Sequence, residues 1–181
     1  FFFIFKIIGY KNSSNLGELI GKKIGPFFRS KSRIKSNLEN SNIGTSHAER
    51  EILINNMWGN YGRILSEYVY LKQFRKNDLN QFIEIEGLNF LEEIKKNDER
   101  VVFISGHFNN FELMAMEIEK AGINLCTIYR PLNNPFLNIL VEKFRKNYIC
   151  KNQIKKGKNG TRQLLNFFKK NFSVALMIDQ R

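Results

Sequence analysis

Short apolar runs alternate with stretches of helical spacing along residues 101–178. The apolar runs predict buried strands at 101–104, 124–129 and 173–178, with a shorter strand near 148–150. The spacing between them predicts helices at 111–120, 134–147 and 159–170. Strands that alternate with helices in this way are typical of an α/β fold, a mostly parallel sheet flanked by helices.

The preceding half of the chain has mainly helical patterns. Ser46 followed by Glu49 is a capping-box pattern that begins a long helix. Its apolar positions recur at three and four: Ile52, Leu53, Met57, Tyr61, Ile64, Leu65, Tyr68 and Val69. This stripe predicts core packing, with part of an acyl-chain groove as the alternative.

Further elements are predicted on either side of that helix. Residues 13–15 (Ser-Ser-Asn) offer an N-cap for a helix that Gly25 and Pro26 end. Residues 82–86 alternate between apolar and acidic side chains, which predicts a strand. A short helix at 88–96 follows Gly87.

The first 40 residues suggest contact with a membrane. Residues 1–10 are apolar except for Lys6, but they are too few to span a bilayer, which needs about 20 residues. They are either a buried helix end or the tail of a membrane anchor. Residues 27–40 form a basic amphipathic stretch that suits an anionic membrane surface, although a helix packed on the domain fits equally.

Charge narrows the range of partners. The net charge is +12, and residues 141–170 hold ten Lys or Arg and one acid, Glu142. Basic clusters of this kind suit anionic lipid, phosphorylated saccharide, an acidic carrier protein or nucleic acid. Cys126 and Cys150 have no paired spacing, so neither a disulfide framework nor a zinc site is predicted. We expect Cys126 to be buried and inert.

A candidate catalytic pair follows the strand at 101–104. His107 stands where ligands bind in open α/β sheets, at a strand's carboxyl end. Asn109 and Asn110 could cap the next helix, whose N-terminal N–H groups suit a phosphate or an oxyanion. Glu112, in the first turn, could hold one ring nitrogen of His107 and leave the other as a general base. This pattern suggests acyl transfer; the alternative is a solvated histidine beside an unrelated helix-cap carboxylate.

Five motifs now point to one family. Residues 106–112 (Gly-His-Phe-Asn-Asn-Phe-Glu) resemble the G-H-F-G-N-W-E signature of the lipid A biosynthesis acyltransferases, the lauroyl/myristoyl type within the lysophospholipid-acyltransferase-like superfamily. Two positions depart from it: Asn109 replaces Gly, and Phe111 replaces Trp. Asn tolerates left-handed backbone, and Phe keeps an apolar ring, so neither change removes a proton-transfer group.

The other four motifs keep the family's order from about residue 51 to 181. They resemble W-x-N-x-G-R-x-x-x-E, Y-R-P-x-D-N-P, G-x-R-x-L-L and D-Q, and they stand at 58–67, 129–135, 160–165 and 179–180. The family continues past its D-Q segment, so we interpret the chain as a fragment cut at both ends. Residues 1–45 would be a membrane-proximal helical segment, and 46–181 an acyltransferase α/β domain that is incomplete at its C-terminal end.

The resemblance implies an acyltransferase at the cytoplasmic face of an inner membrane. It would move a fatty acyl chain from an acyl carrier protein thioester to a hydroxyl of a lipid A precursor, without metal or cofactor. His107 and Glu112 would be catalytic. The expected substrate-binding residues are Arg130, Arg145, Arg162 and Asp179.

Two alternatives stay open at this stage. The same motifs fit acyltransferases for other acceptors, such as phosphatidylinositol mannosides or lysophospholipids. A basic nucleic-acid-binding domain would explain the charge, but the chain carries no recognised nucleic-acid motif, and we expect no nucleic-acid partner. Acyl-chain length depends on the depth of a groove that the sequence does not reveal.

Overall fold

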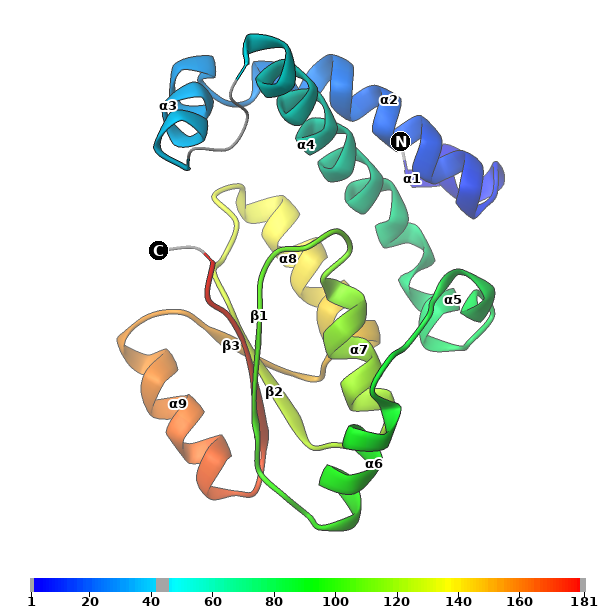
Figure 1. Ribbon diagram of the computed structural model, residues 1–181. Helices are drawn as coiled ribbons and strands as arrows, with labels where there is room; N and C mark the ends of the chain where they lie inside the picture. Colours follow the sequence, from blue (N-terminus) through cyan, green and yellow to red (C-terminus); the bar gives the residue numbers. More distant parts are fainter. Residues whose placement is uncertain (1, 42–45, 180–181) are drawn as a thin grey trace. The chain divides into compact units, whose positions relative to one another are not determined.

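The computed structural model describes residues 2–41 and 46–179 (Figure 1). The chain divides into two compact units, Phe1–Tyr70 and Leu71–Arg181, which are described separately. Parts of three sequence predictions lie outside the described residues: Phe1 in the apolar start, 42–45 at the predicted domain boundary, and Gln180 in the D-Q motif. The long helix that begins after Ser46 belongs to the first unit.

The first unit is helical. Its elements are α1 (Phe2–Ile7), α2 (Tyr10–Ile24), the 3-10 turn η1 (Gly25–Phe27), α3 (Lys31–Ser41), α4 (His47–Glu67) and the 3-10 turn η2 (Tyr68–Tyr70). The predicted capping box at the start of α4 is confirmed, because Ser46 and Glu49 exchange both side-chain-to-backbone hydrogen bonds. The predicted end of α2 at Gly25 is also confirmed.

The predicted N-cap of α2 is wrong. The helix begins at Tyr10, after Gly9 with φ 80°, so Ser13 and Ser14 lie inside it and are buried. Their hydroxyls are used in packing instead of capping: Ser13 bonds the carbonyl of Phe5, and Ser14 donates to Glu67 Oε1 at 2.7 Å. A helix-interior serine is acceptable here because each hydroxyl has a partner.

Small residues make the contact between α2 and α4. A side chain at Gly17, Gly21 or Gly62 would collide with backbone atoms of the opposite helix. The two helices therefore approach closely along a glycine-lined face. This packing corrects the predicted core stripe: Ile64 and Tyr68 are buried, but Ile52, Leu53, Tyr61 and Leu65 are exposed. Apolar periodicity alone cannot show that the glycine face is the buried one.

Replacing Gly62 by alanine should destabilise the first unit by about 1–3 kcal/mol, because a methyl group there pushes the α2 backbone away. Gly59→Ala is the matched control, since its methyl group would meet side-chain carbons of Glu18 and Lys22, which can move. Urea unfolding followed by fluorescence measures the effect in this unit, since Trp58 is the only tryptophan. Equal unfolding free energies for the two variants would contradict the glycine contact.

The second unit begins with α5 (Leu71–Arg75), the 3-10 turn η3 (Asn80–Phe82) and α6 (Leu88–Lys96). The helix predicted at 88–96 is confirmed, but the strand predicted at 82–86 is wrong. The amide of Ile83 donates to the carbonyl of Asn80, as in a turn. Ile83 and Ile85 line a surface pocket with Leu88 of α6, so their alternation reflects local packing and not strand pairing.

Four parallel strands form the sheet of the second unit: β1 (Val102–Ser105), β2 (Leu125–Tyr129), β3 (Asn152–Lys155) and β4 (Ser173–Met177). Their spatial order is β1-β4-β2-β3. The helices between them are α7 (Glu112–Lys120), α8 (Pro135–Phe144) and α9 (Lys158–Lys169). In Figure 1, α9 lies on one side of the sheet and α7 with α8 on the other. The predicted α/β class is confirmed.

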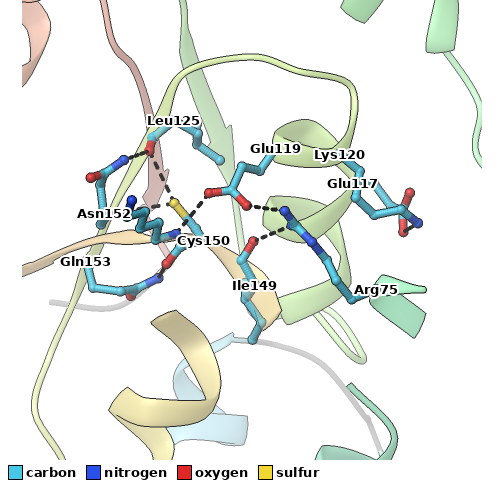
Figure 2. A network of polar contacts seen from close by, with 10 residues as sticks. Arg75, Glu117, Glu119, Lys120, Leu125, Ile149, Cys150, Asn152 and Gln153 are labelled. Atoms are coloured by element: carbon cyan, nitrogen blue, oxygen red, sulfur yellow. Dashed lines mark hydrogen bonds and ion pairs between the residues drawn. The ribbon is translucent and has the colours of Figure 1, made fainter. Parts of the chain in front are cut away.

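The strand predicted near 148–150 is wrong, because β3 begins at Asn152. A π-helical turn, η4 (Arg145–Ile149), continues α8, and the amide of Cys150 donates to the carbonyl of Arg145. Arg75 donates to the carbonyl of Ile149 at 3.4 Å (Figure 2). The backbone groups of this segment are thus satisfied without a sheet partner.

The polar network of Figure 2 joins the end of α7 to the start of β3. Glu119 on α7 pairs with Arg75 at 2.7 Å and accepts from the backbone amide of Lys151 at 2.9 Å. Cys150 Sγ lies 3.2 Å from the carbonyl of Leu125. These contacts fix where the π-helical turn ends and the strand begins.

The sheet packs on α9 through an apolar core. Cys126, Ile154 and Val174 are buried there, and the partly buried side chains of Leu164, Phe167 and Phe168 pack against them. The predicted burial of Cys126 is confirmed. Burial raises the pKa of the Cys126 thiol to about 11 and that of the buried Cys150 thiol to about 12.

Candidate active site

The carboxyl ends of β1 and β4 lie side by side. The two strands pair in parallel, with Ser105 opposite Met177, and the amide of Ile178 donates to the carbonyl of Ser105 at 3.0 Å. His107 and Asp179 each follow two residues after this pair. The sheet order therefore brings together two residues that are 72 positions apart in the chain.

Asp179 holds His107 at two points. The backbone N–H of His107 donates to Asp179 Oδ2 at 2.9 Å, and ring Nδ1 lies 2.8 Å from Asp179 Oδ1. Two hydrogen bonds lower the pKa of Asp179, the larger effect coming from the His107 backbone N–H and the smaller from the His107 ring. The Asp179 carboxyl is therefore ionised at neutral pH. A carboxylate on Nδ1 favours the tautomer with the proton there, which leaves Nε2 as an acceptor. The side chain of His107 is 30% exposed, so reactants can reach it.

A tight turn joins His107 to α7. Asn109 has φ 40°, the left-handed backbone expected where this chain replaces the family's glycine. The helix begins at Glu112 with Phe111 at the N-cap position, so the predicted asparagine cap is wrong. The ring of Phe111 meets that of His107 edge-on, with centroids 4.7 Å apart. The aromatic side chain at this position thus limits the orientation of the imidazole.

Glu112 is paired with Arg145. Its buried carboxylate accepts from Arg145 Nε at 2.8 Å and from a terminal guanidinium nitrogen at 2.5 Å. The guanidinium carbon of Arg145 lies 5.9 Å from the ring centre of Tyr129. The structure therefore brings together His107 with Asp179 and Glu112 with Arg145. The predicted hydrogen bond between His107 and Glu112 stays a prediction.

The other predicted arginines are exposed. Arg130 directly follows β2, at the same sheet edge as His107, and Arg162 lies on α9. Phosphate binding by these two residues stays a prediction. Arg145 differs, because its side chain is only 15% exposed and it already contacts Glu112.

The sequence reasoning missed a second polar cluster at this edge, formed by Tyr129, Glu142 and Lys155. Tyr129 and Lys155 end β2 and β3 in register. The pKa of Tyr129 is raised mainly by burial and secondly by its hydrogen bond to Glu142. The bond from Tyr129 is the main reason that the pKa of Glu142 is lowered, and Lys155 Nζ lies 3.3 Å from its Oε1. The sequence carried a signal for Tyr129 alone, since the strand predicted at 124–129 ends there, whereas Lys155 ends a strand that was predicted at 148–150.

Metal-binding clusters and membrane-spanning helices are absent from residues 2–41 and 46–179. Within these ranges, no group of three or more His, Cys, Asp or Glu side chains could hold a metal ion. No helix in the described part of the chain is long and apolar enough to cross a membrane.

The geometry suits general base catalysis. An imidazole held by a carboxylate at one nitrogen, with its other nitrogen accessible, is the arrangement that removes a proton from a hydroxyl. The neighbouring start of α7, a nine-residue helix, adds partial positive charge.

The chain is similar to curated lipid A biosynthesis acyltransferases over part of their length. The chain is 25% identical over 133 residues to lipid A biosynthesis acyltransferase 2 of Shigella flexneri, covering 71% of this chain and 41% of that protein. It is 22% identical over 103 residues to the lipid A biosynthesis myristoyltransferase of Escherichia coli (strain K12), covering 57% of this chain and 32% of that protein. The matches thus span less than half the length of these relatives. The family model described as bacterial lipid A biosynthesis acyltransferase matches residues 1–181, and the chain therefore belongs to that family.

Proposed function

We propose that the complete protein transfers a fatty acyl chain from an acyl carrier protein thioester to a hydroxyl of a lipid A precursor. The observation that carries this proposal is the contact between His107 and Asp179 at the carboxyl edge of the sheet. Membership of the lipid A acyltransferase family supports the acceptor.

In the proposed reaction, His107 is the general base. Its Nε2 takes the proton of the acceptor hydroxyl as the oxygen attacks the thioester carbonyl. The tetrahedral intermediate collapses to an ester and expels the thiolate of the carrier, which receives the proton from the imidazolium. Asp179 fixes the tautomer and stabilises the imidazolium, so it acts as a positioning residue. The N-terminal N–H groups of α7 are close in the chain to His107 and suit the developing oxyanion.

The carboxylate that orients His107 can be identified with two isosteric variants. We expect Asp179→Asn to lower kcat by about 10²–10⁴-fold with little change in KM, because the amide cannot stabilise the imidazolium in the same way. Glu112→Gln should lower kcat by less than about tenfold, because Glu112 binds Arg145 at the start of α7 and would affect His107 only indirectly. Steady-state kinetics of both variants decide the matter. A larger loss of kcat in Glu112→Gln would return the orienting role to Glu112, as the sequence predicts.

Basic residues at the same edge would bind the anionic partners. Arg130 follows β2, and Arg162 lies on α9. Arginine binds phosphate with two parallel hydrogen bonds, which suits the phosphates of the glycolipid acceptor. The acidic carrier protein would meet the lysines between 151 and 158. We place this reaction at the cytoplasmic face of the inner membrane, where the acceptor lipid and the carrier meet.

Membranes that contain the complete protein test the proposal. They are incubated with acyl carrier thioesters of several chain lengths and a tetraacylated, sugar-extended lipid A precursor, and the product is weighed by mass spectrometry. A gain of one acyl chain supports the proposed reaction. Transfer only to a lysophospholipid or a mannolipid would overturn the acceptor, and no transfer to any acceptor would overturn the enzyme function.

A further inference from the structure

Three polar side chains of α8 and the turn that continues it make contacts within the second unit. Asn138, Glu142 and Arg145 fall within about 60° of one another on a helical projection. Asn138 accepts from the amide of Leu132 at 2.9 Å and donates to Glu142 at 2.6 Å, while Arg145 pairs with Glu112. These three side chains therefore bind groups within the second unit and do not face solvent freely.

The opposite face is apolar and exposed at its first turns. Phe136 is 83% exposed and Ile139 is 67% exposed. Large apolar side chains on the solvent side of a helix depart from the usual pattern in a soluble domain. Such a face marks an interaction surface.

The charges on this face indicate what covers it. Lys143 is exposed and lies within about 40° of Phe136 and Ile139 on the helical projection. Lys146 is exposed in the π-helical turn that continues the helix. The only acid of α8 and η4 is Glu142, which faces inward. Interfacial helices bury apolar side chains about 5–10 Å into the boundary between headgroups and acyl chains. Exposed apolar side chains beside exposed lysines therefore suit an anionic bilayer.

We propose that α8 docks on an anionic lipid bilayer through this face, with Phe136 and Ile139 at the acyl-chain boundary and Lys143 and Lys146 at the lipid phosphates. The docking itself does not depend on the proposed function. Its biological role does, because docking would bring His107 to the level of a lipid acceptor. An acidic protein partner is the competing explanation, and the dye experiment below separates it from a bilayer.

A dye at position 136 tests the docking directly. Phe136→Cys is labelled with the environment-sensitive dye NBD, while burial and raised pKa values protect Cys126 and Cys150 from labelling. With vesicles of phosphatidylcholine and phosphatidylglycerol, we expect the emission to rise and shift to the blue. Lipids that carry a quencher near the headgroup end of the acyl chain should then quench it. The matched control is Phe90→Cys, because Phe90 is also an exposed aromatic residue of this unit, at 63%. Its dye should not respond.

Vesicle sedimentation gives the second readout. Phe136→Ser should weaken binding to the anionic vesicles by at least about tenfold, whereas Phe90→Ser should change it by less than about twofold. Lys143→Glu should weaken binding to anionic vesicles and leave binding to pure phosphatidylcholine unchanged. A dye at position 136 that stays silent on vesicles to which the chain is bound would overturn the proposal and assign the face to a protein partner or another part of the chain. Neither readout needs an acyl substrate, so failure here is distinct from failure of the proposed reaction.

Discussion

The His107→Ala variant is expected to transfer acyl chains about 10²–10⁴-fold more slowly than the wild type, because removal of a general base has an effect of this size. The loss should fall on kcat, since the proposed role of the imidazole is proton transfer and not phosphate binding. Single-turnover transfer with a saturating acyl thioester measures it directly. The fold should survive, because the His107 backbone can keep its hydrogen bond to Asp179 in the variant.

His47 provides the matched control, since it is the only other histidine of the chain. It lies in the first turn of α4, in the first unit, and is exposed. His47→Ala should therefore retain full activity. Transfer at the wild-type rate by His107→Ala, with an unchanged melting temperature, would remove this residue from the mechanism.

The position of His107 could be predicted because it depends on local signals. An apolar run ended by Ser105 and Gly106 places the next residue at the carboxyl end of a strand. The partner of its ring could not be found in this way. Asp179 reaches His107 only because β4 pairs with β1, although β2 and β3 intervene in the sequence. Strand order is a long-range property, and the spacing of apolar residues does not determine it.

Burial was harder to predict than secondary structure. The helical period of α4 was correct, but its apolar stripe is largely exposed, since Gly17, Gly21 and Gly62 allow a different face to pack. Alternation at 82–86 was equally misleading, because Ile83 and Ile85 line a pocket while the backbone follows a turn. In both segments the burial of the apolar residues is set by long-range contacts, which the spacing of residues in the sequence does not reveal.

The Arg145→Met variant should destabilise the second unit by about 3–5 kcal/mol, because it removes the cation that faces a buried carboxylate. Glu112 is 4% exposed, so water cannot replace the guanidinium at low cost. Methionine keeps most of the apolar stem, which limits the loss of packing. Urea unfolding followed by far-ultraviolet circular dichroism measures the effect.

Two further variants separate the effect of the unpaired buried charge on stability from the effect of lost packing. Adding Glu112→Gln to Arg145→Met should recover much of the lost stability, because the buried charge is then absent. Lys155→Met removes the cation of the Glu142 pair, but that lysine side chain is 62% exposed, so we expect a loss below about 1 kcal/mol. If Arg145→Met lowered the free energy of unfolding as little as Lys155→Met, the Glu112 carboxylate would not depend on Arg145. A hydrogen bond from His107 to Glu112 would then become the better explanation of the sequence motif. The unfolding free energies of Arg145→Met and Lys155→Met thus test both what stabilises the second unit and which carboxylate hydrogen-bonds to His107.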